Sequence, residues 1–326
     1  MKTPVKIALL GTGMAAAAVH TRLQQEENVD IQVFDKSRGI GGRLATRYTD
    51  THQFDHGAQF FTARTAAFQS FLQERDEIAA WTPNITTLTR DQAPFKRIWY
   101  EPHYVATPRM NGLCRKVFLH ANLSLGTEIT NILRCSDGYL LQAKDGSRYG
   151  PFDRVISSAP AEQTARIFSS ITTTPFDAVR FDPCFALMVP LTEEDTLPSF
   201  DAAVVRDSPI SWLAFTDSNP GRSCAPSLIA HSRGDWAREH LDDDPAVIRQ
   251  QIGDALTTLT GLPEDAIANS SLHRWRYART TQPLGAPYWL TEDNRLGACG
   301  DWCLGERVED AFTSGMAIAN AIIESL

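Results

Sequence analysis

The stretch that decides the fold is VKIALLGTGMAAAAVHTRL, residues 5–23. Its first six residues are a near-continuous apolar run of strand length, as expected of a strand buried on both faces. Gly11 then allows a tight turn, Gly13 lets the backbone approach a pyrophosphate, and the small Ala16 lets a following helix pack closely on the sheet. Free N–H groups and the positive dipole end make the N-terminus of such a helix an anion site. The stretch therefore predicts a strand, a turn and a helix that together bind a nucleotide.

A second strand is expected from Asp30 to Phe34, and it ends at Asp35. A carboxylate that follows the glycines by about 20 residues suits hydrogen bonds to ribose hydroxyls. A glycine motif alone also fits an ordinary tight turn, but Asp35 favours nucleotide binding. This part of the sequence does not separate NAD from FAD as the ligand.

The composition limits the class of protein. The 326 residues are enough for one large or two ordinary domains, and no apolar run approaches the about 18 residues of a membrane span. We therefore expect a soluble globular protein in the cytoplasm, with no membrane partner. The net charge of −8 and the absence of a basic stripe in the sequence argue against nucleic acid. The six cysteines form no C-x-x-C pair, so they are expected to be reduced thiols. His52 and His56 are expected to be a structural pair rather than a metal site, and no metal is expected.

A glycine-rich basic loop, Lys36-Ser37-Arg38-Gly39-Ile40-Gly41-Gly42-Arg43, follows Asp35, and no regular secondary structure is expected there. Arg43 offers a forked donor for phosphates. The glycine pair before Arg43 resembles the second motif of a large group of FAD proteins, the flavin-binding amine oxidase superfamily. This resemblance moves the expected ligand from NAD to FAD.

A third motif lies near the C-terminus. Leu296 to Asp301 fits a short strand that ends at Gly300 and Asp301, and a helix with an apolar face follows from Val308. The Gly-Asp pair before a helix resembles the third FAD motif, which implies that Asp301 holds the ribityl chain and that the helix directs its N-terminus at the flavin pyrimidine ring. A helix N-terminus stabilises the negative charge that gathers at N1 and O2 of a reduced flavin.

Five segments together resemble bacterial renalase-like proteins, and the likeness runs from end to end. They are Gly11 to Gly13, Arg38 to Arg43, Asp55 to Arg64, His273 to Arg279 and Gly300 to Leu304. The resemblance implies a noncovalent FAD enzyme that oxidises the 2- and 6-dihydro isomers of NAD(P) to NAD(P)+. Hydride would pass to flavin N5, and O2 would be reduced to hydrogen peroxide. Because the flavin carries the hard step, the protein is expected to supply orientation and exclusion of water.

The resemblance also implies the residues of the site. Cofactor contacts are expected at Gly11, Gly13, Met14, Ala15, Asp35, Lys36, Gly42, Arg43, Ala58, Gln59, Phe60, Ile129, Gly300, Asp301, Val308 and Glu309. His231, Trp275 and Tyr277 are expected to line the cleft on the flavin face, where an aromatic wall would suit a planar dihydronicotinamide.

The predicted fold class is α/β: a Rossmann-like FAD-binding domain of the glutathione reductase or p-hydroxybenzoate hydroxylase type, with a second substrate domain built on a mixed or antiparallel sheet plus helices. The FAD-binding domain is expected in residues 1–78, 124–172 and 288–326, and the substrate domain in residues 79–123 and 173–287. Further elements expected are a strand entering a turn at 55–64, a helix at 65–80, a meander with Asp-Gly turns at 124–160, and a helix from Pro245 to Gly261.

Two positions depart from the renalase-like pattern. Arg109 stands in place of a glycine near the flavin, which alters the expected cleft geometry. Asp310 also replaces a glycine, so either its carboxylate points away from the flavin or the flavin is harder to reduce. A flavin-containing amine oxidase of the monoamine oxidase kind and a non-catalytic flavin or nucleotide sensor stay open as alternative functions. The preference for NAD or NADP isomers, the physiological electron acceptor and the oligomeric state also stay open.

Overall fold

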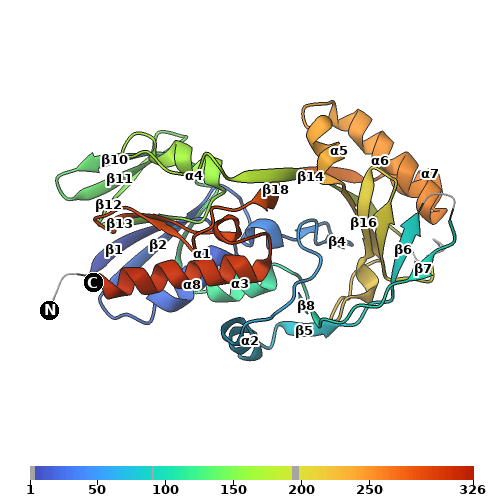
Figure 1. Cartoon of the computed structure of the whole chain (residues 1–326), viewed down its shortest axis with the longest axis horizontal. Coiled ribbons are helices and arrows are strands. Elements are labelled where there is room, and N and C mark those ends of the chain that lie inside the picture. The colour runs from blue at the N-terminus through green and yellow to red at the C-terminus, as the bar shows by residue number, and fades with distance from the viewer. Residues whose placement is uncertain (1–3, 90–91, 193–197) are drawn as a thin grey trace.

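The computed structural model describes residues 4–89, 92–192 and 198–326. Residues 1–3 of the predicted FAD-binding domain, and 90–91 and 193–197 of the predicted substrate domain, lie outside the described residues. Figure 1 shows two lobes, each built on one large sheet, with the long strands β14 (Arg180–Pro190) and β18 (Ser271–Gln282) reaching from one lobe to the other.

The first lobe is organised around β1, which lies inside a six-stranded sheet of order β19-β20-β13-β1-β2-β9. These strands are β1 (Val5–Leu10), β2 (Val29–Asp35), β9 (Asn122–Leu125), β13 (Arg154–Ser157), β19 (Trp289–Leu290) and β20 (Leu296–Ala298). All neighbours pair in parallel except β19 and β20. A parallel order with β1 at the centre is the arrangement that the N-terminal motif predicts.

The two faces of this sheet are covered by different layers. On one face lie α1 (Met14–Leu23), α3 (Gly112–Val117) and α8 (Val308–Glu324), and on the other lie α4 (Ala161–Phe168) and the meander β10 (Ile129–Cys135), β11 (Gly138–Ala143) and β12 (Arg148–Phe152). Successive residues of β1 alternate between the two layers: Leu9 packs in the helical core, whereas Leu10 packs against the meander. This double burial explains the continuous apolar run in the sequence.

The second lobe contains a seven-stranded sheet of order β18-β14-β17-β16-β15-β6-β7. Its other strands are β6 (Ile85–Thr89), β7 (Phe95–Lys96), β15 (Ala202–Arg206), β16 (Ile210–Phe215) and β17 (Ser227–Ser232), and its helices are α5 (Gly234–Glu239), α6 (Pro245–Thr260) and α7 (Glu264–Ala268). The sheet is mixed, because β15 and β6 are parallel while the other neighbours are antiparallel. The predicted ends of α6 are confirmed: the Asp244 carboxylate accepts a hydrogen bond from the Ala246 N–H, and Gly261 ends the helix with a φ of 73°.

Three local predictions differ from the structure. The helix expected at 65–80 is shorter, α2 (Ala66–Gln73), because Ile78 starts the strand β5 (Ile78–Trp81), which pairs with β8 (His103–Ala106). Residues 55–64 form no strand of their own beyond an isolated bridge from Phe61 to Tyr104, and the strands nearby are the short β3 (Arg47–Tyr48) and β4 (Gln53–Phe54). The loop 36–43 runs into a 3-10 turn, Gly42–Leu44, and further 3-10 turns cover Thr216–Ser218 and Asp301–Cys303.

The architecture confirms the predicted α/β class with a second, mixed sheet. Within the predicted substrate segment 79–123, β6 and β7 join the second sheet, whereas α3 packs with α1 on the first. The domain boundaries themselves stay a prediction.

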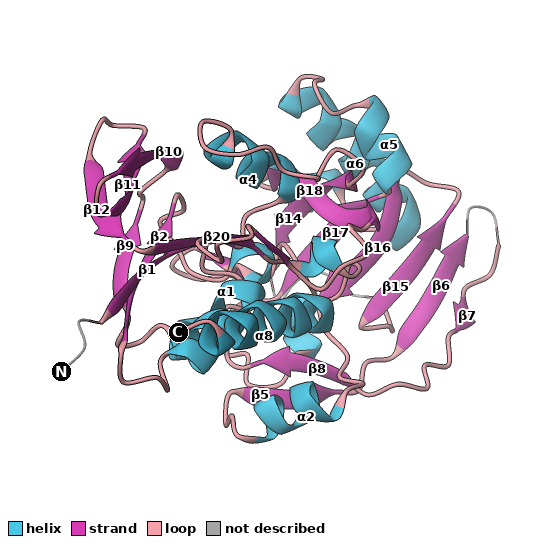
Figure 2. Ribbon diagram, turned by 60° about the vertical axis from the view of Figure 1, so that its left-hand side comes forward, coloured by secondary structure: helices cyan, strands magenta, loops and turns pink. Residues whose placement is uncertain are grey.

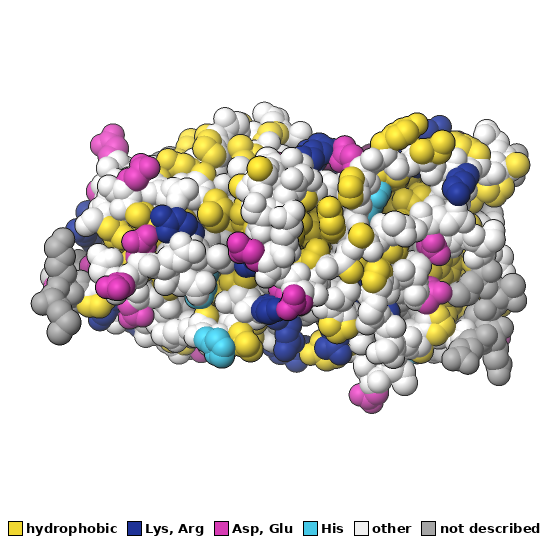
Figure 3. All heavy atoms as spheres, turned by 90° about the horizontal axis from the view of Figure 1, so that it is seen from below, with side chains coloured by type: hydrophobic (Ala, Val, Ile, Leu, Met, Phe, Trp, Pro, Cys, Tyr) yellow, Lys and Arg dark blue, Asp and Glu magenta, His cyan; other side chains and the backbone are white. Residues whose placement is uncertain are grey.

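The six cysteines are free thiols. None of the described helices has both the length and the apolar character needed to cross a membrane. On the face shown in Figure 3, basic and acidic side chains lie interspersed with apolar ones, so neither sign of charge forms a continuous field there.

Candidate functional site

A cavity of about 1710 Å³ lies between the two lobes. It is lined by the glycine turn after β1, by the end of β2 and by the N-terminus of α8, and from the second lobe by β14, β16, β17 and β18. Pockets for a single small molecule are usually about 300–1,000 Å³. The cavity is therefore large enough for a dinucleotide together with a second ligand.

The glycine turn shapes one part of the cavity. Gly11 has a φ of +110°, a conformation that other residues rarely adopt, and a Cβ there would collide with the Ser158 hydroxyl. Gly13 precedes α1, and no side chain in the described chain caps that helix. Its first N–H groups are therefore free to bind an anion, as the sequence predicts. Gly11, Gly13, Met14 and Ala15 all line the cavity.

Asp35 is fixed beside this turn. Its carboxylate accepts hydrogen bonds from the Thr12 hydroxyl at 2.5 Å and from the Ser37 N–H at 2.8 Å. Lys36 also lines the cavity and donates to the side chain of Gln163 at 3.3 Å. Ile129 serves both the cavity and the core, because it lines the cavity while packing in the cluster beneath the meander.

The second and third sequence motifs meet in the cavity. The Arg43 guanidinium donates two hydrogen bonds to the Asp301 carboxylate, with Nη1 2.8 Å from Oδ2, and a third to the Ala278 carbonyl at 3.1 Å. The Asp301 side chain is 4% exposed, and Gly42 and Gly300 line the cavity beside the pair. The fork of Arg43 is therefore directed at a carboxylate, so a phosphate would have to compete with Asp301 for it.

The N-terminus of α8 lies at the cavity through Val308. Asp310 does not line the cavity, because its carboxylate turns back to its own loop and accepts hydrogen bonds from the N–H groups of Glu306 (3.0 Å) and Arg307 (2.9 Å). The structure supports the first of the two outcomes expected for Asp310, a carboxylate that points away from the cavity. Glu309 is buried outside the cavity and accepts from the N–H groups that precede α2, those of Arg64 at 3.1 Å and Thr65 at 2.6 Å.

The segment after β4 passes the cavity at Gly57 and Ala58. A Cβ on Gly57 would collide with the Arg43 carbonyl oxygen, which also accepts the Ala58 N–H at 2.9 Å. Two neighbours predicted as cofactor contacts do not line the cavity. Gln59 is buried and donates to the Asp55 carbonyl, and Phe60 packs against His103 with ring centroids 4.5 Å apart. For these residues and for Glu309, cofactor contact stays a prediction without support from the cavity.

Three histidines and a tryptophan form the wall on the side of the second lobe. The rings of His56 and Trp275 are stacked with centroids 5.1 Å apart, and His273 stands edge-on to both at 4.7 and 4.4 Å. The His56 carbonyl accepts the Trp275 indole N–H at 2.8 Å and lies 3.1 Å from His231 Nε2. The sequence predicted Trp275 and His231 as cleft residues, and both line the cavity together. His56 and His273 were missed as site residues, although each lies in a segment that carries the family resemblance.

Burial keeps this wall uncharged. It lowers the pKa of His56 to about 3, with smaller contributions from the charges of His273 and Arg47, and it lowers the pKa of His231 to about 4. Burial and then Arg47 lower the pKa of His273 to about 4. The three imidazoles are therefore neutral near pH 7.

Tyr277 and Arg109 lie apart from the wall. Tyr277 lines the cavity, but its hydroxyl is bound, donating to Glu162 at 2.8 Å and accepting from Arg166 at 3.0 Å. Burial, and after it Glu162, raises the pKa of the Tyr277 phenol. Arg109 stacks its guanidinium over the ring of Tyr48 at 4.7 Å and does not itself line the cavity.

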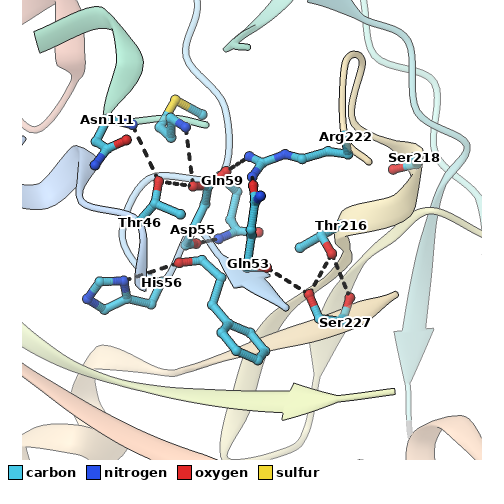
Figure 4. A network of polar contacts seen from close by, with 12 residues as sticks. Thr46, Gln53, Asp55, His56, Gln59, Asn111, Thr216, Ser218, Arg222 and Ser227 are labelled. Carbon is cyan, nitrogen blue, oxygen red and sulfur yellow. Dashed lines mark hydrogen bonds and ion pairs between the residues drawn. The ribbon is translucent and has the colours of Figure 1, made fainter. Parts of the chain in front are cut away.

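A buried polar network supports the segment 46–59 from behind (Figure 4). The carboxylate of Asp55 pairs with Arg222 from the second lobe, and it also accepts the Thr46 hydroxyl at 2.5 Å and the Met110 N–H at 3.2 Å. The side chains of Arg222 and Asp55 are 1% and 2% exposed. Because His56 directly follows Asp55, this network fixes part of the cavity wall. No sequence motif indicates this ion pair, because Asp55 and Arg222 are far apart along the chain.

No group of three or more His, Cys, Asp or Glu side chains within residues 4–89, 92–192 and 198–326 is arranged to hold a metal ion.

The glycine turn, the carboxylate after β2 and the two helix N-termini around one cavity define a Rossmann-type protein with a site suited to a nucleotide. The family models identify the class more closely. The model for NAD(P)-binding Rossmann-like domains matches residues 10–75, and the model for flavin containing amine oxidoreductases matches residues 110–323. The chain belongs to the flavin containing amine oxidoreductase family, which implies a flavin cofactor and an enzyme.

Individual relatives agree with this placement. A 73-residue stretch is 37% identical to the prenylcysteine oxidase 1-like protein of Bos taurus, covering 22% of this chain and only 15% of that relative. Among solved structures, the chain resembles a protein assigned as a protoporphyrinogen oxidase from Exiguobacterium sp. 255-15, with a TM-score of 0.77, 10% identity and full coverage of both chains. It also resembles a putrescine oxidase bound to putrescine, with a TM-score of 0.71, 10% identity and coverage of 98% of this chain and 99% of that one. At these identities the structural likeness shows the fold alone.

Proposed function

We propose that this protein is an FAD-dependent oxidase that converts the 2- and 6-dihydro isomers of NAD(P) to NAD(P)+, with reduction of O2 to hydrogen peroxide. The observation that carries the proposal is the neutral aromatic wall of His56, His273 and Trp275, which faces the same cavity as the glycine turn. An uncharged aromatic wall suits a planar dihydronicotinamide ring. The resemblance to renalase-like proteins supplies the particular isomers.

The residues present fit FAD. The uncapped N-terminus of α1 can bind a pyrophosphate, Asp35 can accept ribose hydroxyls, and Asp301 can accept hydroxyls of a ribityl chain. We propose that binding is noncovalent. Cys303, which follows Asp301 by two residues, is fully buried away from the cavity lining, and burial raises the pKa of its thiol to about 12. A thiol so buried is not available as a thiolate for attachment to a flavin.

When bound, a flavin supplies a hydride acceptor and passes the electrons on to O2. The side chains of this chain bind and orient the substrate. Trp275 is held by its bond to the His56 carbonyl, so its ring has a fixed direction before any ligand arrives. His56 and His273 add apolar ring surface without charge, which favours exclusion of water around the reacting carbon.

Five of the six carboxylates that line the cavity already bind a cationic side chain, Glu128 binding Lys144 and the other four binding arginines, whereas Asp35 accepts hydrogen bonds from Thr12 and Ser37. Asp182 binds Arg238, Asp235 binds Arg233, Asp301 binds Arg43 and Glu306 binds Arg279. At these five carboxylates a substrate ammonium would have to displace an existing ion pair, and Asp35 is the carboxylate that we propose accepts ribose hydroxyls of the cofactor. This arrangement makes an uncharged or anionic substrate the better fit. We further propose that the protein works in the cytoplasm.

An anaerobic assay tests the proposed function. Purified protein is reconstituted with FAD and mixed separately with isomerised NADH, ordinary NADH and common amines, and the flavin absorbance is followed. Bleaching by the isomer mixture alone, followed by peroxide formation on admission of air, is expected. Bleaching by amines would overturn the proposal in favour of an amine oxidase, and the absence of bleaching by any of the three would indicate a non-catalytic flavoprotein.

A further inference from the structure

We propose that Arg47 forms an oxyanion subsite beside the aromatic wall and that it selects substrates carrying a phosphate or carboxylate. The inference rests on the proposed function only for the identity of the substrate, because the subsite itself is argued from this chain's charges and contacts. It adds a specificity-determining residue to the cavity, one that no sequence motif indicates.

Arg47 lies on the cavity at the short hairpin β3–β4. It lines the cavity with Tyr48, and its backbone pairs with Phe54, two residues before His56. The charge of Arg47 acts on both His56 and His273, where it adds to burial in lowering the pKa of each ring. The hairpin register and the shared cavity lining therefore place Arg47 at the same part of the cavity as His56, the wall at which the substrate ring is expected, and the effects on the pKa values agree with that place.

Arg47 has no polar partner for its side chain within the described part of the chain. Four other arginines that line the cavity bind a carboxylate: Arg43 binds Asp301, Arg233 binds Asp235, Arg276 binds Asp242 and Arg279 binds Glu306. Arg38, on the loop after β2, also lines the cavity without such a partner among the described residues, so Arg47 is distinguished by its place beside the aromatic wall. The chain has 39 acidic residues against 31 Lys and Arg, so acidic partners are abundant in general. The absence of one at Arg47 leaves a forked donor free to bind an external anion.

The surroundings of Arg47 keep its charge uncompensated. The nearby imidazoles of His56 and His273 are neutral, so they add no positive charge to repel a ligand and no negative charge to pair with the guanidinium. Behind Tyr48 lies a second guanidinium, that of Arg109, whose buried Nε has no hydrogen-bond partner among the described residues. Arg47 and, behind the next residue Tyr48, Arg109 therefore bring two positive charges to this hairpin, which favours a compact oxyanion and opposes an ammonium group.

A binding experiment on the FAD-loaded protein tests the subsite without turnover. Nicotinamide mononucleotide and nicotinamide riboside differ only by the 5′-phosphate, and benzoate and benzamide differ by one carboxylate. The dissociation constant of each probe is measured from the change in flavin absorbance for the wild type, Arg47→Met and Arg47→Lys. Arg148→Met, a substitution at an exposed arginine of β12 outside the cavity, removes the same charge elsewhere and serves as the matched control.

We expect the wild type and Arg148→Met to bind at least one anionic probe about tenfold more tightly than its neutral counterpart, since only the anionic probe can form a charge-assisted hydrogen bond with Arg47. Arg47→Met should abolish this preference. Arg47→Lys should retain part of it, because the charge stays while the fork is lost. A preference confined to the phosphate pair identifies the ligand group as a phosphate, and one confined to the carboxylate pair identifies it as a carboxylate. An Arg47→Met protein with unchanged preference would overturn the subsite.

The subsite and the proposed function can fail separately. If the wild type oxidises the dihydro isomers and Arg47→Met does so with the same KM, the function stands and the subsite is wrong. If the wild type leaves the isomers unoxidised, yet Arg47→Met loses the preference for an anionic probe, the subsite stands and the proposed substrate is wrong.

Discussion

Breaking the buried ion pair of Asp55 and Arg222 is expected to destabilise the protein strongly. Arg222→Met removes the guanidinium but keeps much of the apolar stem, so that the Asp55 carboxylate, 2% exposed, is left with the Thr46 hydroxyl and the Met110 N–H as its donors. Breaking a buried ion pair by removal of one partner costs about 3–5 kcal/mol, because the remaining charge stays buried without compensation. We therefore expect the free energy of unfolding to fall by about 3–5 kcal/mol.

Urea denaturation of the apoprotein, followed by tryptophan fluorescence, measures this loss. The matched control is Lys144→Met, which breaks the exposed pair with Glu128, whose side chains are 73% and 42% exposed. Exposed pairs contribute about 0–1 kcal/mol, so the control should stay close to the wild type. The double variant Asp55→Asn with Arg222→Met removes both charges and should be less destabilised than the sum of the two single variants.

Two results would refute this reasoning. If Arg222→Met lowers the free energy of unfolding by less than about 1 kcal/mol, the buried pair contributes no more than an exposed ion pair does. Additive losses in the double variant would show that the two side chains contribute independently, so that the ion pair itself is not what stabilises the segment before His56.

Three further outcomes are expected. Gly57→Ala should weaken FAD binding, because its Cβ would collide with the Arg43 carbonyl oxygen and relieving the overlap costs about 1–3 kcal/mol. A fluorescence titration measures the flavin affinity. In the control Gly112→Ala, where the atom nearest to the added Cβ is 3.4 Å away, the affinity should stay unchanged. Asp310→Gly should leave the flavin reduction potential unchanged, because the Asp310 carboxylate binds N–H groups of its own loop, and a changed potential would contradict this geometry. The loss of these capping hydrogen bonds should lower the free energy of unfolding by about 1 kcal/mol. His231 has a pKa of about 4 in the folded protein against about 6.5 when exposed, so the unfolded chain takes up the proton first as the pH falls. Its contribution to stability should be complete above pH 6.5 and decline towards pH 4, and His231→Gln should show a shallower loss of unfolding free energy over that window; equal slopes would show that the ring is not held neutral.

The elements that could be predicted, in both lobes, are those whose sequence signals are local. The strand before Gly11 and the cap at Asp244 are each specified by neighbouring residues, and the structure places them as expected. The Asp-Gly signals of the meander are local in the same way, since short turns fix the pairing of the strands they join: Cys135 lies opposite Gly138 at the first turn and Gln142 opposite Arg148 at the second.

The errors arose where distant segments decide the structure. Ile78 continues a helical pattern, yet it pairs with Ala106, and the gain from that strand pairing outweighs the helical tendency of its neighbours. The sequence predicts that the Arg43 guanidinium donates hydrogen bonds to a phosphate, but in the folded chain it donates them to the Asp301 carboxylate. Likewise, nothing local to His56 indicates that Trp275 stacks on it, because the two are brought together only by the contact between the lobes.

The order of the cavity residues along the chain has a consequence for biosynthesis. Gly11 and Asp35 are among the first cavity residues to leave the ribosome, while Asp301 and Val308 come after both large sheets have been specified. N-terminal segments generally fold first during synthesis. A nascent chain could thus present the nucleotide turn early, but it would have no partner for Arg43 until Asp301 emerges. Stable loading of the cofactor is therefore expected as a late event, after translation of α8 rather than as a nucleus for folding.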